Sequence, residues 1–94
     1  MEDERQECIP NFIGNAVIIL TASYLGCEVE MLDTAREVWR TKRLPEAVLL
    51  GRYGNAARNA VAAVQKRGLA EQADRLGEIF YRTGEFPPPE EDNT

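Results

Sequence analysis

The stretch that decides the fold reads Ile9-Pro-Asn-Phe-Ile-Gly-Asn-Ala-Val-Ile-Ile-Leu-Thr-Ala-Ser-Tyr-Leu25. It contains no charged residue, although charged residues make up 29% of the chain. When residues 12–25 are wound as a helix at about 100° per residue, apolar side chains point in every direction. The polar residues form no continuous stripe. A helix of this kind must be covered on all sides, either by a membrane or by protein.

A membrane is the weaker of these two covers. A helix of 15 residues is roughly 22 Å long, whereas the hydrocarbon core of a bilayer is about 30 Å thick. Asn11 and Asn15 would also lie inside the span. The residues before the stretch, Met1-Glu-Asp-Glu-Arg-Gln-Glu7, are acidic, whereas a signal peptide begins with a basic segment. We therefore expect a cytoplasmic protein with no membrane segment.

The remaining cover is protein. A chain of 94 residues is one domain, and a small domain has little interior in which to enclose a helix. We therefore expect a second copy to cover the free side of this helix in a homodimer. The alternative is that the helix is the central one of a monomeric bundle. The predicted dimer interface consists of Phe12, Ile13, Ala16, Val17, Ile18, Leu20 and Tyr24.

The rest of the chain predicts an all-α fold, a small bundle of about four helices. The first helix should end at Gly26 and the third at Gly68, because glycine readily adopts the left-handed conformation that ends a helix. Leu69 should fold back on the end of the third helix. The predicted helices cover residues 12–25, 28–42, 45–67 and 70–82.

Three details of these predicted helices need separate mention. Thr34 and Glu37 match a capping box, which leaves a break near Leu32 open in the second helix. Gly51-Arg-Tyr-Gly54 is expected to interrupt the third helix as a kink or short turn. Residues 16–31 could alternatively form a β-hairpin, because they are rich in β-branched residues and end in an alternating segment.

The helical domain is expected to span residues 9–86. Residues 1–8 should form a flexible acidic arm, and residues 87–94 a disordered tail that begins with three prolines and continues with acidic residues. Phe86 is expected to anchor the end of the domain.

The sequence offers no assembled catalytic machinery. The chain has no histidine, which is the commonest general base. Its two cysteines, Cys8 and Cys27, lack zinc-site spacing; we expect both to be reduced thiols, with Cys27 buried as a small apolar residue. No nucleotide-binding glycine loop is present. We therefore predict that the protein is not an enzyme and has no catalytic, cofactor or metal site.

Interface-type residues indicate a protein that acts by binding another protein. Trp and Arg often dominate the binding energy of interfaces, and the single tryptophan, Trp39, is flanked by Arg36, Arg40 and Arg43. Tyr53, between two glycines, is expected at an exposed turn. These five residues are the predicted partner site, although Trp39 and Tyr53 are equally compatible with core positions. The predicted function is that of a regulator that sequesters or inhibits a partner such as a transcription factor, as an antiactivator does.

The alternative is a transcriptional regulator that binds DNA through residues 36–67. This segment carries eight basic residues against two acidic ones, a local charge of +6, whereas the whole chain carries −5. A helix-turn-helix drawn around the expected turn at 51–54 would present Arg58, Asn59 and Gln65 to DNA. The acidic total makes nucleic acid the weaker partner.

Overall fold

The computed structural model describes residues 11–44 and 50–88, which fold into four α-helices. The helices are α1 (Asn11–Tyr24), α2 (Leu32–Thr41), α3 (Leu50–Lys66) and α4 (Ala70–Thr83). This part of the chain contains no strand, so the predicted all-α bundle of four helices is confirmed and the hairpin over residues 16–31 is wrong. The predicted arm at 1–8 with Cys8, the start of the third helix at 45–49, and tail residues 89–94 lie outside the described residues.

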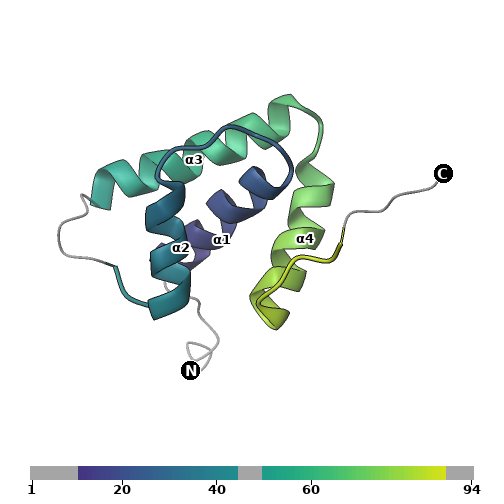
Figure 1. The fold of residues 1–94 in the computed structure, drawn as a ribbon. Coiled ribbons are helices and arrows are strands. Elements are labelled where there is room, and N and C mark those ends of the chain that lie inside the picture. The colour runs from purple at the N-terminus through teal and green to yellow at the C-terminus, as the bar shows by residue number, and fades with distance from the viewer. Residues whose placement is uncertain (1–10, 45–49, 89–94) are drawn as a thin grey trace, which may run out of the picture.

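The apolar helix α1 is the centre of the bundle. It contacts each of the other three helices, which lie around it in Figure 1. Ala16, Ile19 and Ala22 are at most 1% exposed. The other three helices therefore already cover much of α1, as in the monomeric alternative, and a homodimer stays a prediction.

Glycine ends α1 as the sequence predicts. Gly26 has φ 92°, a value that costs a side-chain-bearing residue energy but not glycine. The amide of Cys27 donates to the carbonyl of Ala22 at 3.0 Å, which satisfies one of the free carbonyls at the helix end. Gly68, with φ 72°, ends α3 in the same way.

The second helix begins later than the predicted range of 28–42, at Leu32. The residues before it run in a non-helical segment in which Cys27 is buried and Val29 and Met31 pack against the core. Buried or half-buried side chains therefore do alternate with exposed ones over residues 27–31, but they belong to a connecting segment that packs against the core and not to a strand. Met31 then adopts φ 60° and α2 starts immediately after it, at the break that the capping-box pattern had left open.

The turn predicted at residues 51–54 is wrong, because α3 runs without interruption through both glycines. Two glycines in a helix cost about 1 kcal/mol each relative to alanine. Tyr53 lies between them and is 0% exposed, and burying a side chain of this size stabilises by roughly 3 kcal/mol. Its hydroxyl also donates to the carbonyl of Phe12 at 2.8 Å. Tertiary packing thus outweighs the local preference for a turn.

Candidate functional site

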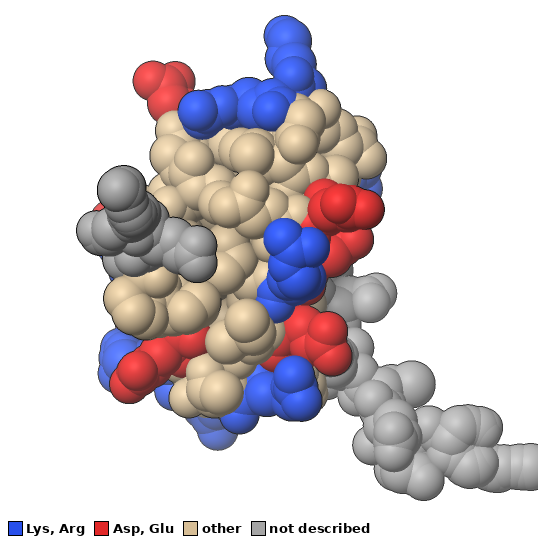
Figure 2. Space-filling model, turned by 90° about the vertical axis from the view of Figure 1, so that its right-hand side faces the viewer, with Lys and Arg blue, Asp and Glu red and all other residues tan. Residues whose placement is uncertain are grey.

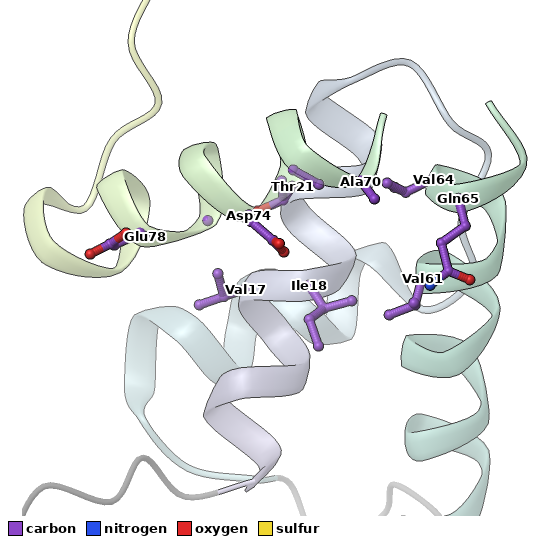
Figure 3. A pocket seen from close by; sticks show the side chains of 11 residues that line it. Val17, Ile18, Thr21, Val61, Val64, Gln65, Ala70, Asp74 and Glu78 are labelled. Atoms are coloured by element: carbon purple, nitrogen blue, oxygen red, sulfur yellow. The ribbon is translucent and has the colours of Figure 1, made fainter. Parts of the chain in front are cut away.

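A groove lies between α3 and α4, with α1 as its floor (Figure 3). Its volume is about 290 Å³. The floor is formed by Val17, Ile18 and Thr21, one turn of α1. These residues belong to the uncharged stretch near the start of the chain, so the groove opens onto part of α1.

The two walls of the groove differ in character. The α3 wall presents Val61, which is 37% exposed, together with Val64 and Gln65. The α4 wall includes the small residues Ala70, Ala73 and Gly77. Small side chains leave space beside a helix backbone, and α3 contacts α4 much less than α1 contacts either helix. Hence the groove stays open instead of being filled by side chains from the two walls.

The hydroxyl of Thr21 is the unusual group of the groove. Thr21 is 2% exposed, and within the described residues its Oγ1 has no hydrogen-bond partner. A Cβ built on Gly77 would lie 3.6 Å from this oxygen, at van der Waals distance, so Oγ1 lies against α4. A buried hydroxyl without a partner costs about 1–3 kcal/mol. Because the oxygen itself is buried, a group bound in the groove would reach it only if α4 moved aside.

Acidic side chains border the groove on the α4 side. Asp74 and Glu78 both line it and both are exposed. Neither carboxylate lies within 4.0 Å of a basic group in residues 11–44 and 50–88. Figure 2 looks onto the side of the molecule where α4 lies and shows uncharged surface between acidic and basic side chains there. The groove therefore combines an apolar floor with a negative edge.

Trp39, the predicted centre of the partner site, is half-buried. Its ring centroid lies 4.7 Å from that of Phe80 and 6.2 Å from that of Tyr81. The ammonium of Lys42 lies 3.6 Å from the Trp39 ring centroid. These neighbours hold Trp39 in the contact between α2 and α4, so it has a structural role whatever it binds.

The other predicted partner residues divide into two groups. Arg36, Arg40 and Arg43 are exposed; the first two pair with acidic residues of their own helix, at 3.2 Å and 2.5 Å. Tyr53 does not belong with them, because it is buried between α1 and α3 and bonded to the carbonyl of Phe12. The prediction of an exposed Tyr53 is wrong, since the turn that would have presented it is helical.

The predicted dimer residues also divide. Ile13 and Ala16 are 9% and 0% exposed, so these two face the interior of their own chain and are not available to a second copy in this conformation. Val17 is also 9% exposed and contributes to the groove floor. Tyr24 is 38% exposed, but its ring stacks on Phe86 at 4.4 Å. This contact confirms the predicted anchoring role of Phe86. The remaining three predicted residues are half-buried: Phe12, Ile18 and Leu20.

The DNA-binding alternative required a helix-turn-helix with its turn at residues 51–54. This turn is not present, because residues 50–66 form one helix. Arg58 and Asn59 are exposed on α3. Arg58 donates to the side chain of Asn55, and Gln65 lines the groove. These side chains are basic or polar surface positions on one helix and do not form a recognition helix after a turn.

Sequence reasoning missed the groove and two of its main features. Thr21 was a polar residue inside an apolar helix, and that pattern was its only signal. Ala70, Ala73 and Gly77 follow helical spacing, so a small-residue face on the last helix was readable. Which side of α1 that face would meet depends on how three helices pack, and no local pattern contains this information.

Comparison of the chain with protein-family models, with curated proteins and with solved structures found no match.

Across the described part of the chain, no helix has the length and apolar character needed to cross a bilayer. The same residues bring together no group of three side chains able to bind a metal ion. Cys27 is 7% exposed, as predicted for a small buried residue, and Arg67 donates to its sulfur at 3.8 Å.

Proposed function

We propose that this protein is a non-enzymatic regulator that binds another protein, and that the partner docks in the groove between α3 and α4. The observation that carries the proposal is an open, mostly apolar groove bordered by the exposed carboxylates of Asp74 and Glu78. Sites that bind partners combine apolar surface with a few polar groups that fix orientation. The two carboxylates of α4 supply such groups here.

The proposed mode of action is sequestration. A segment held in the groove is unavailable for the partner's own contacts, such as dimerisation or DNA binding by a transcription factor. An antiactivator needs only affinity and a surface, which agrees with a chain that has no histidine and no assembled nucleophile and base. The step from fold to this role rests on the groove and not on the helical bundle, because bundles serve many functions.

The test is affinity capture from the native cytosol with three baits: the unmodified protein, Ala70→Trp and Gln72→Trp. Ala70 lines the groove, whereas Gln72, two residues further along α4, does not. Both residues are exposed, so the two substitutions add the same side chain at similar cost to folding. We expect one protein near stoichiometric amounts with the unmodified protein and with Gln72→Trp, and its loss with Ala70→Trp.

Two results would overturn the proposal. Equal recovery of the partner with both tryptophan variants would place the contact outside the groove. Recovery of nucleic acid alone, with steep salt dependence and sensitivity to Arg58→Ala, would favour the DNA-binding alternative. Circular dichroism of each bait checks that both variants retain the helix content of the unmodified protein.

A further inference from the structure

We infer that the groove accepts a basic amphipathic helix of the partner protein, whose apolar side lies on α1 and whose cationic side chains lie beside Asp74 and Glu78. This inference rests on the proposed function and specifies the chemistry of the partner. Helix-in-groove docking is a common mode of recognition, in which an apolar face enters a groove on the receptor.

The size and lining of the groove suit the side chains of a helix. A volume of about 290 Å³ lies just below the range for small-molecule sites, which is about 300–1,000 Å³. Ala70, Ala73 and Gly77 form one wall at helical spacing. Small residues let a second helix approach closely, because little side chain stands between the two backbones. The apolar residues Ile18 and Val61 then meet its apolar side chains.

The charge of the groove edge selects a cationic partner. Asp74 and Glu78 are four residues apart on α4, so their carboxylates lie on the same side of the helix. Both are exposed, and neither is paired with a basic residue in the described ranges. The α3 wall opposite them contributes no charge, since its side chains are Val61, Val64 and Gln65. Lysine or arginine beside an apolar stripe would complement this edge.

Charge also argues against the two acidic ends of the chain itself as occupants. The sequence before α1 carries Glu2, Asp3, Glu4 and Glu7, and the C-terminal end carries Glu90, Glu91 and Asp92. These segments would meet the acidic edge with charge of the same sign. A second copy of the chain carries a net charge of −5 overall but +6 over residues 36–67, so its occupancy is tested by sedimentation velocity.

The test uses the full chain and two fluorescent peptides of about 18 residues, a length at which an isolated helix can form. One peptide places leucine on one helical face and lysine on the other; the second replaces every lysine with glutamate. Fluorescence anisotropy is measured with the unmodified protein, with Asp74→Asn/Glu78→Gln and with Glu28→Gln/Glu30→Gln. The last variant removes the same total charge from two exposed residues that do not line the groove.

We expect the leucine–lysine peptide to bind and the leucine–glutamate peptide to bind at least about tenfold more weakly. Neutralising the groove edge should weaken the leucine–lysine peptide about fivefold, because each exposed ion pair contributes modestly, and the control variant should change its binding less than twofold. Equal effects of the two neutralised variants, or equal binding of the two peptides, would overturn the inference of a basic helix.

Ala70→Trp separates failure of this inference from failure of the proposed function. If it abolishes peptide binding while the charge variants have no effect, the groove is a docking site but does not select basic helices. If it leaves peptide binding unchanged, the groove is not the docking site and both proposals fall. Sedimentation velocity of the pure protein adds a further check: a dimer that Ala70→Trp dissociates would make a second copy the occupant and overturn the inference.

Discussion

Ionisation of Tyr53 should destabilise the fold at alkaline pH. Burial of the Tyr53 hydroxyl between α1 and α3 raises its pKa from 10.0 to about 12. The folded state therefore holds the proton more tightly than the unfolded chain does. The stabilisation is fully present below pH 10, and it is lost as the pH rises through the interval between the two pKa values.

The magnitude follows from the two pKa values. At pH 11 about nine-tenths of the Tyr53 hydroxyls are ionised in the unfolded chain and about one-tenth in the folded protein. The corresponding loss in the free energy of unfolding is about 1.4 kcal/mol, the equivalent of one pH unit. Above pH 12 the loss approaches about 3 kcal/mol.

The assay is urea unfolding at pH 9 and pH 11, followed by circular dichroism, for the unmodified protein and for Tyr53→Phe. At pH 9 the substitution should cost about 1 kcal/mol, because it removes the hydrogen bond to the carbonyl of Phe12. Other groups titrate equally in both proteins, so their contributions cancel. At pH 11 the difference should vanish or reverse. If the two proteins differ in free energy of unfolding by the same amount at both pH values, the Tyr53 hydroxyl is not buried and hydrogen-bonded as described.

Four further substitutions test other parts of the structure. Thr21→Val should raise the free energy of unfolding by about 1 kcal/mol in urea titrations, because it removes a buried hydroxyl that has no partner; a loss of stability would mean that the hydroxyl is bonded. Gly26→Ala should lower the melting temperature, at a cost of about 1–2 kcal/mol, because its φ is 92°. Gly54→Ala should raise it, since the residue is helical and the added Cβ meets nothing within 4 Å; the same sign for both glycines would contradict this backbone assignment. Phe86→Ala removes two stacked contacts of 4.4 Å and should speed proteolysis after Gly84 while costing about 1–3 kcal/mol; unchanged proteolysis would mean that the ring does not hold this segment.

The helix ends were predictable where the sequence has a glycine that stops the helix. Gly26 and Gly68 end α1 and α3 because the left-handed conformation is open to glycine, and this preference is local. The helix over residues 70–82 was also predictable, because Ala73, Leu76 and Phe80 recur at helical spacing, and Phe80 is buried. These features depend on residues close together in sequence.

The errors arose where distant packing decided the outcome. Residues 51–54 read locally as a turn, but the ring of Tyr53 is buried against a helix 41 residues away and holds the segment helical. The start of α2 moved for a similar reason, because Val29 and Met31 pack against the core before the helix begins. The groove combines residues of α1, α3 and α4, and its geometry follows from the angles between those helices.

The measurement that tests the central claim most directly is methyl NMR of the labelled protein, titrated with the partner recovered by capture. The groove supplies methyl probes at Ile18, Thr21 and Val61. Val38, which is 0% exposed on α2, serves as the reference. Docking in the groove predicts that the groove methyls shift or broaden at stoichiometric partner while Val38 stays in place. Shifts confined to α2, with the groove methyls unchanged, would contradict it and move the binding site to the surface around Trp39.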